Sequence, residues 1–161
     1  MIIIVMGVSG AGKTTVGRLL AEDLTWPFFE GDDFHPPANV AKMSEGIPLT
    51  DEDRWPWLDS LRKLISGLVA EGQDAVIACS ALKQAYRDRL QQSDNEVVFA
   101  YLKGNYETIA DRLAVRQDHF MSPDLLAPQF STLEEPQIVL TVGIDQGPSE
   151  IVRAVKEGLN L

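Results

Sequence analysis

The stretch Gly7–Thr14, which reads Gly-Val-Ser-Gly-Ala-Gly-Lys-Thr, constrains the fold more than any other part of the chain. It fits the pattern G-x-x-x-x-G-K-[ST], in which glycines let consecutive backbone N–H groups turn inward around a phosphate. The apolar run Met1–Met6 precedes it, and apolar residues at helical spacing follow it. A buried strand, a glycine loop and a helix are therefore predicted, with the phosphate at the helix N-terminus.

We expect this loop to hold the phosphates of ATP together with Mg²⁺. Lys13 can reach the β- and γ-phosphate oxygens, which makes it a catalytic candidate, and the Thr14 hydroxyl is a candidate Mg²⁺ ligand. The alternative is a glycine-rich turn that carries Lys-Thr by chance, and the flanking strand and helix disfavour it. The residues expected to bind nucleotide here are Gly7, Ser9, Gly10, Ala11, Gly12, Lys13, Thr14 and Thr15.

Length, charge and cysteine content exclude several classes of protein. The 161 residues predict one domain, residues 1–161, and the one cysteine, Cys79, ends an apolar run typical of a buried strand. The net charge of −10 argues against nucleic acid or an anionic membrane as a partner. The first apolar run is too short to span a membrane, so we expect a cytoplasmic protein. A homodimer is compatible with the sequence.

Apolar runs alternate with amphipathic segments along the rest of the chain. This alternation predicts an α/β fold, the three-layer P-loop NTP-binding fold, with a five-stranded parallel sheet and helices on both faces. Ligands of such sheets bind beyond the carboxyl ends of the strands, so polar residues that follow a strand are site candidates. The predicted strands are Met1–Met6, Trp26–Glu30, Ala75–Cys79, Val97–Leu102 and Ile138–Val142.

Two acids and a histidine follow the second predicted strand. Asp32 or Asp33 could orient or deprotonate a substrate hydroxyl, or hold Mg²⁺ through water, and His35 lies close by in the sequence. The structural alternative is an Asx-type turn that caps the next helix. We favour the functional interpretation because the acids follow a strand in a chain that also carries a P-loop.

Several cations are placed where they can bind an anion. Arg54 follows a Thr50 N-cap and a run of acids that suit the positive end of a helix. Ser80 and Lys83 follow the third predicted strand, and Arg87 lies on the helix after it. A solvated helix face is the alternative for Lys83 and Arg87, and the pattern leaves both interpretations open.

The segment at about 114–124 has little apolar periodicity and predicts a mobile lid between two helices. Arg112 and Arg116 are four residues apart on one helix face, from which they could close over a transferred phosphoryl group, and Arg112 is also expected to bind the nucleotide. A plain surface loop with solvated arginines is the alternative. Farther on, Asp145 and Gln146 follow the fifth predicted strand and are placed to flank an adenine ring.

The motifs narrow the class of P-loop protein. No aspartate ends a buried strand in the manner of a Walker B element, and the guanine-reading pattern N-K-x-D does not occur. The length leaves no room for an ATPase motor with added domains. A small-molecule kinase is the class that fits best.

The chain resembles the gluconokinase family, small P-loop kinases that are similar in fold to shikimate kinase and nucleoside-monophosphate kinases. The resemblance runs from the P-loop to Pro136, and its most specific stretches are Gly-Asp-Asp-Phe-His-Pro from Gly31 and Cys-Ser-Ala-Leu-Lys from Cys79. Further matching stretches are Asp53-Arg54 with Pro56-Trp57-Leu58, Tyr86-Arg87, Tyr101–Gly104, His119-Phe120 and Gln129-Phe130 through Leu133-Glu134 to Pro136.

This resemblance implies ATP-dependent phosphorylation of D-gluconate at its 6-hydroxyl. Catalysis would fall to Lys13, Asp32, Arg112 and Arg116, with Mg²⁺ held by Thr14 and Asp32. Another acceptor, of the shikimate or nucleoside-monophosphate type, and a nucleotide-binding module without catalysis are the alternatives. The residues expected around the substrate are Asp32, Asp33, His35, Arg54, Ser80, Lys83, Arg87 and His119, with an arginine or lysine on the carboxylate and His35 on hydroxyls.

Lys13→Ala is expected to lower turnover by about 100-fold or more, because it removes a cation from the developing charge of the transferred phosphoryl group. Steady-state release of ADP measures this loss. Near-normal turnover would contradict the P-loop assignment.

Overall fold

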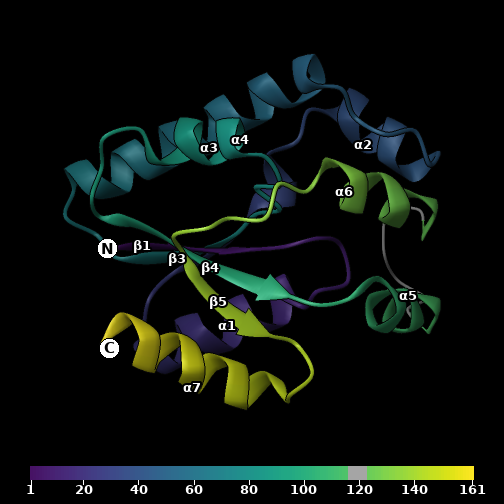
Figure 1. The fold of residues 1–161 in the computed structure, drawn as a ribbon. Coiled ribbons are helices and arrows are strands. Elements are labelled where there is room, and N and C mark those ends of the chain that lie inside the picture. The colour runs from purple at the N-terminus through teal and green to yellow at the C-terminus, as the bar shows by residue number, and fades with distance from the viewer. Residues whose placement is uncertain (116–122) are drawn as a thin grey trace.

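The computed structural model describes residues 1–115 and 123–161, and it centres on a five-stranded sheet in which the pairings are parallel. The strands lie in the order β2-β3-β1-β4-β5. The predicted parallel sheet is thus confirmed, with β1 in the middle (Figure 1). The strands are β1 (Ile2–Met6), β2 (Phe28–Glu30), β3 (Ala75–Ala78), β4 (Val97–Lys103) and β5 (Leu140–Gly143).

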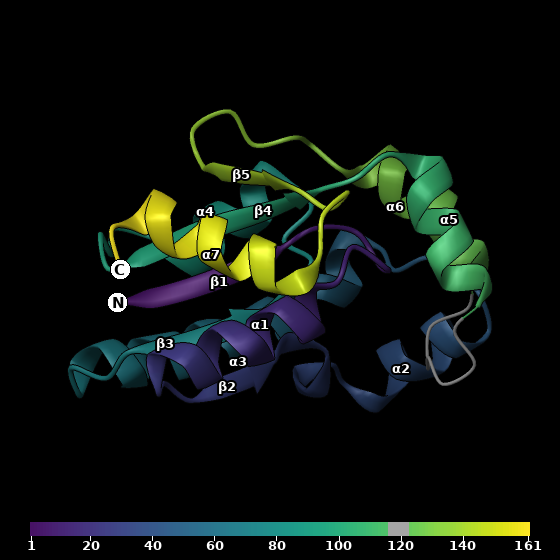
Figure 2. The ribbon, with the colours of Figure 1, turned by 90° about the horizontal axis from the view of Figure 1, so that it is seen from below.

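Helices cover both faces of this sheet, as predicted. They are α1 (Lys13–Leu24), α2 (Pro37–Ser44), α3 (Asp51–Ala70), α4 (Gln84–Gln91), α5 (Tyr106–Ala114), α6 (Leu126–Thr132) and α7 (Pro148–Leu159). Two 3₁₀ turns, η1 (Gly31–Phe34) and η2 (Pro123–Leu125), precede α2 and α6. Helices α3 and α4 lie over one face of the sheet, and α1 and α7 lie over the other (Figures 1 and 2).

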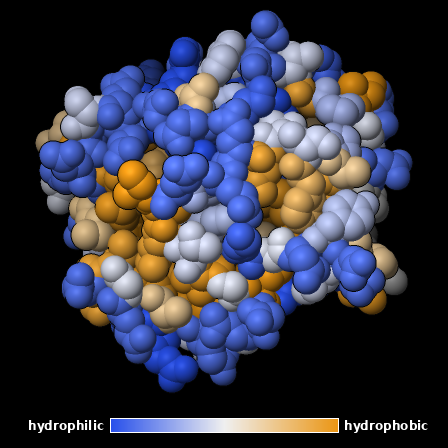
Figure 3. All heavy atoms as spheres, in the orientation of Figure 1, coloured by the Kyte–Doolittle hydropathy of each residue, from blue (hydrophilic) through white to orange (hydrophobic). Residues whose placement is uncertain are grey.

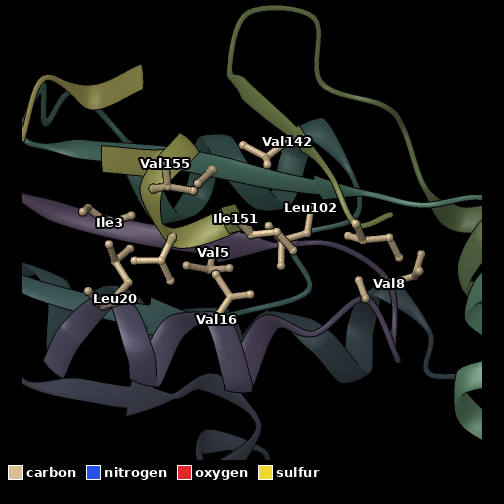
Figure 4. Close-up of a cluster of buried hydrophobic side chains, with 14 of the residues drawn as sticks. Ile3, Val5, Val8, Val16, Leu20, Leu102, Val142, Ile151 and Val155 are labelled. Carbon is tan, nitrogen blue, oxygen red and sulfur yellow. The ribbon is translucent and has the colours of Figure 1, made fainter. Parts of the chain in front are cut away.

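Alternate residues of β1 belong to two separate hydrophobic cores. Ile3 and Val5 pack with Val16 and Leu20 of α1 and with residues of α7 and the neighbouring strands (Figure 4). On the opposite face, the other β1 side chains pack among residues of α3 and α4. Successive strand residues point to opposite faces, so a central strand covered on both sides must be apolar throughout, as the run Met1–Met6 is.

Strand β5 is shorter than the sequence predicts. Ile138, expected within it, is 97% exposed, and pairing with β4 begins only at Leu140. Strand β5 lies at the edge of the sheet and pairs with β4 alone. The apolar run in its sequence therefore does not show at which residue the pairing begins. Apolar side chains also appear in the middle of the face in Figure 3, over the region where β5 lies in Figure 1.

The predictions about Cys79, the lid and the domain organisation have different outcomes. Cys79 is buried, as expected for a core residue, and burial raises the pKa of its thiol to about 12. The lid predicted at about 114–124 falls mostly on residues 116–122, outside the described residues, so it stays a prediction, as does the single-domain organisation. Within residues 1–115 and 123–161, the helices are too short or too polar to cross a bilayer.

Gly31 lies so close to β3 that a side chain has no room. A Cβ at Gly31 would meet the Ala78 carbonyl oxygen at 2.3 Å, and the Gly31 carbonyl accepts a hydrogen bond from Trp57 Nε1 at 2.8 Å. Gly31→Ala is therefore expected to lower the free energy of unfolding by about 1–3 kcal/mol, measured by urea denaturation.

Gly67→Ala is the matched control for this change. Gly67 lies on the exposed side of α3, and a Cβ there would meet nothing within 4 Å. Alanine should raise the free energy of unfolding by about 0.5–1 kcal/mol, because it favours the helix. Equal effects of the two substitutions would contradict the steric account.

Candidate active site

The carboxyl ends of β1, β2 and β3 meet at one edge of the sheet, where a cavity joins the P-loop to the segments that follow β2 and β3. The Gly7 N–H donates to the Ser80 carbonyl oxygen at 3.3 Å, which ties the ends of β1 and β3 together. Residues from α2, α3, η2 and α6 complete the walls. The cavity is lined by Ser9, Gly10, Lys13, Thr14, Asp32, His35, Met43, Pro48, Leu49, Arg54, Trp57, Ser80, Leu82, Leu125, Pro128, Gln129 and Thr132.

The P-loop has a backbone that only glycine adopts easily. Gly10 and Gly12 have φ values of 81° and 98°, in the left-handed region, and α1 begins directly after Gly12. Lys13 Nζ lies on the inner side of the loop, where it donates to the Val8 carbonyl oxygen at 3.0 Å. This arrangement places a helix N-terminus and a lysine ammonium at the same point, as a phosphate site requires.

Glu30 is a site residue that the sequence analysis missed. The Thr14 hydroxyl donates to Glu30 Oε2 at 2.6 Å, so the last residue of β2 reaches the start of α1. The rule used for Asp32, polar residues at the carboxyl end of a strand, could have found it.

The oxygen atoms near Thr14 fit a magnesium ion. Mg²⁺ prefers oxygen ligands and is often held by one or two carboxylates together with nucleotide phosphates and water. The Thr14 hydroxyl and the Glu30 carboxylate supply such oxygens, and Asp32 lies one residue beyond Glu30. Among the described residues, no three His, Cys, Asp or Glu side chains form a group that could hold a metal ion.

Asp32 is the acid whose environment differs most from water. The pKa of its carboxyl group is raised to about 6, mainly by burial; the Lys13 ammonium opposes this rise, and the Glu30 and Asp33 charges contribute to it. Its Oδ1 atom lies 3.8 Å from Nε2 of His35. Near neutral pH the carboxylate is ionised but close to its pKa, which is the condition for exchanging a proton.

His35 is held as a neutral ring on the cavity wall. Its side chain is 3% exposed and stacks on Trp57, with ring centroids 4.1 Å apart. Burial lowers the pKa of His35 to about 4, and the Arg54 charge lowers it too. A neutral imidazole carries one donor and one acceptor nitrogen, so it can bind hydroxyl groups without adding charge.

Arg54 of α3 is, with Lys13, one of the cations that line the cavity. Its side chain is 14% exposed, and Nη1 donates to the Tyr86 hydroxyl at 3.1 Å. Nη1 also lies 3.9 Å from Asp51 Oδ1, and the Tyr86 hydroxyl donates to that same carboxylate. The guanidinium is therefore fixed in position but keeps further N–H donors for a ligand.

Arg87 requires a correction, because it is not among the cavity residues. It is 2% exposed, and its guanidinium donates to the carbonyl oxygens of Ala81 and Glu134 at 2.8 and 2.9 Å. These contacts fasten the loop after β3 to the segment after α6, which is a structural role. The sequence pattern of a short helix does not indicate such contacts, because the carbonyl groups belong to segments outside the helix.

Two more predicted substrate residues lie outside the cavity lining. Lys83 Nζ pairs with Asp51 Oδ1 at 3.0 Å, and this ion pair raises the pKa of Lys83. Asp33 is exposed and is absent from the lining, although it lies beside Asp32. Ser80, in contrast, lines the cavity as expected.

Gln129 is a second residue that the sequence analysis did not assign to the site. Its Oε1 accepts a hydrogen bond from the Ser9 backbone N–H at 2.7 Å, although 120 residues separate them. Helix α6 thus contacts the P-loop backbone directly. No periodicity or local motif signals a contact between segments this far apart.

A second groove lies on the other side of the P-loop. It is lined by Gly10, Ala11, Gly12, Thr15, Val16, Arg112, Val115, Gln146, Pro148 and Ile151. The predicted nucleotide residues Thr15, Arg112 and Gln146 thus come together, and Arg112 Nη2 donates to the Ile144 carbonyl oxygen at 2.5 Å. Asp145 is exposed and is not part of this lining, while Arg116 and His119 lie outside the described residues.

The raised pKa of Asp32 predicts a pH-dependent effect on stability. The folded protein holds this proton more tightly than the unfolded chain, so stability falls as pH rises from about 4 to about 6. Asp32→Asn should therefore raise the free energy of unfolding by about 1–3 kcal/mol at pH 8, and by much less near pH 4. Urea denaturation at both pH values, without nucleotide or magnesium, measures the difference.

Asp33→Asn is the control, because it removes the same charge from the adjacent residue, which is exposed. An Asp32→Asn effect that is equal at the two pH values would show that ionisation of Asp32 does not oppose folding.

Comparisons with known proteins agree with this geometry. The family model of shikimate kinase matches residues 9–133. A probable gluconokinase of Rattus norvegicus is 43% identical, over 98% of this chain and 97% of its own length. The thermosensitive gluconokinase of Escherichia coli K12 is 48% identical, over 83% of this chain and 72% of its own.

A solved structure extends the comparison to three dimensions. The crystal structure of a gluconokinase from Sinorhizobium meliloti 1021 is 46% identical and superposes with a TM-score of 0.87, covering 98% of this chain and 90% of that one. The shikimate kinase of Aquifex aeolicus, at 18% identity and a TM-score of 0.68, shares the fold. By sequence and by fold, the chain belongs to the gluconokinase family of shikimate-kinase-like P-loop kinases.

Proposed function

We propose that this protein transfers the γ-phosphoryl group of ATP to the 6-hydroxyl of D-gluconate, which yields 6-phospho-D-gluconate and ADP. The observation that carries the proposal is one cavity that is lined both by the P-loop residues Lys13 and Thr14 and by Asp32, His35 and Arg54. That set joins a phosphate site to groups suited to hydroxyls and a carboxylate, the functional groups of gluconate. Membership of the gluconokinase family supports the same substrate.

Phosphoryl transfer depends mainly on positioning and on stabilising charge. In the proposed reaction, Asp32 accepts a hydrogen bond from the attacking hydroxyl and takes its proton as the bond to phosphorus forms. Its raised pKa suits this role, because a base works best when its pKa lies near the working pH. Lys13 stabilises the charge that develops on the transferred group.

We assign the magnesium site to the Thr14 hydroxyl and the Glu30 carboxylate, with Asp32 near enough to contribute through water. Held by these residues, Mg²⁺ would neutralise part of the charge on the nucleotide phosphates. The adenine would lie in the groove beside Arg112 and Gln146. Arg116 and His119, which lie outside the described residues, keep their proposed roles: Arg116 in stabilising the phosphoryl group and His119 in contacting the substrate.

Arg54 is the proposed partner of the gluconate carboxylate. It lines the cavity and is held by Tyr86, whereas Lys83 is paired with Asp51 outside the lining, and Arg87 is bonded to carbonyls. His35 and Ser80 would contact hydroxyl groups along the chain of the substrate. A guanidinium suits this task because it binds a carboxylate with two parallel hydrogen bonds.

ADP release from ATP and Mg²⁺ tests the proposed reaction. The assay compares D-gluconate, shikimate, AMP and no added acceptor, and we expect release above background with gluconate alone. Release with shikimate or AMP instead would overturn the proposed acceptor but keep kinase chemistry. ATP binding without release for any acceptor would favour a binding module.

Arg54→Gln tests the carboxylate contact. Losing a charged hydrogen bond should raise the KM for gluconate by about 10- to 100-fold and leave the KM for ATP nearly unchanged. Lys83→Gln is the matched control, since it removes a cation that lies outside the cavity lining. A larger rise in KM for the Lys83 variant would move the carboxylate site to Lys83.

A further inference from the structure

Asn39 is a buried polar residue of α2 that the proposed reaction does not yet use. It is 4% exposed. Its Nδ2 atom donates to the Asp53 carbonyl oxygen at 2.8 Å and lies 3.3 Å from Nδ1 of His35. The side chain therefore bridges the N-terminal turn of α3 and the ring on the cavity wall.

These two contacts determine which atoms carry hydrogen. A backbone carbonyl oxygen only accepts, so the Asn39 atom that faces Asp53 must be the amide nitrogen. The amide nitrogen has two hydrogens, and the second can be given to His35 Nδ1. Nδ1 must then be the unprotonated nitrogen of the neutral ring, which leaves the hydrogen on Nε2.

We propose that Asn39 is a positioning residue that holds His35 in the Nε2–H tautomer, so that the ring presents a hydrogen-bond donor to the substrate cavity beside Asp32. Nε2 and Asp32 Oδ1 are 3.8 Å apart, too far for a direct hydrogen bond. A substrate hydroxyl that contacts both groups accepts from Nε2–H and donates to Asp32. Asn39 thereby sets the direction of the hydroxyl proton.

Neighbouring residues hold both partners of Asn39, the His35 ring and Asp53, in place. The His35 ring is stacked on Trp57, whose Nε1 is itself bonded to the Gly31 carbonyl oxygen. The Asp53 end is fixed because Asp53 forms a capping box with Thr50 and pairs with Lys42 of α2 at 2.8 Å. With both ends fixed, a tautomer change requires Asn39 to lose a hydrogen bond.

Burial and the positive charge of Arg54 favour the neutral form of the ring, and the Asp32 carboxylate opposes them. Arg54 places a positive charge near His35 and lines the same cavity. Asp32 is the acid that faces Nε2, and it lies too far away for a hydrogen bond to an imidazolium. The ring therefore acts as a neutral donor rather than as a cation.

Nitrogen-15 NMR of the histidine rings tests the tautomer without any substrate. The chain has two histidines, so the His119→Gln background leaves the His35 ring alone. We expect a protonated Nε2 and an unprotonated Nδ1 near neutral pH. A carboxylate cannot donate, so Asn39→Asp should move the proton to Nδ1. The control Asn160→Asp adds the same charge at the exposed C-cap of α7 and should leave the ring signals unchanged.

A protonated Nδ1 in the parent protein would overturn the proposal. So would a folded Asn39→Asp variant that keeps the Nε2–H pattern. Circular dichroism and a thermal melt establish whether that variant is folded, and the parent measurement decides the question if it is not.

A double-mutant cycle tests the consequence for turnover, and this part rests on the proposed kinase function. Asn39→Asp should lower kcat with gluconate by about tenfold, the loss of one hydrogen bond at the reacting hydroxyl. In a His35→Gln background the same change should have much less effect, because a glutamine amide has no tautomer to set. Equal losses in the two backgrounds would show that Asn39 does not act through His35. Absence of activity in the parent, with the Nε2–H tautomer present, would instead count against the proposed function.

Discussion

The parallel pairing of β1 with both β3 and β4 is the constraint on which the rest of the structure depends. It buries β1 on both faces and brings the P-loop out at the same edge as the segments that follow β2 and β3. The P-loop and the residues proposed to bind the acceptor thus lie at one edge, although no single sequence motif contains the whole site. The hydrogen bond from Gly7 to Ser80 makes that convergence a direct contact.

Burial then shifts the pKa values of two of these groups. It acts on an acid and a base in opposite directions, raising the pKa of Asp32 to about 6 and lowering that of His35 to about 4. Near neutral pH the acid is ionised and the imidazole is neutral. In the proposed reaction, the substrate hydroxyl would donate a hydrogen bond to Asp32 and accept one from His35, and Arg54 would bind the carboxylate.

Much of this arrangement can be predicted from the sequence, because strand ends in a parallel sheet share an edge. That rule alone brings together Lys13, Asp32, His35 and Ser80, and it would have included Glu30. It does not reach Gln129, whose contact with Ser9 joins segments 120 residues apart. It also cannot separate Arg54 from Arg87, since helical spacing does not tell a guanidinium in a cavity from one bonded to loop carbonyls.

The two sides of the P-loop are built from different parts of the chain. The acceptor side uses η1, α2 and the first turns of α3, whereas the groove assigned to adenine uses α5 and the start of α7. Gly10 of the P-loop is the residue that lines both spaces, so a side chain added at this one position would act on the proposed acceptor side and the proposed adenine side together.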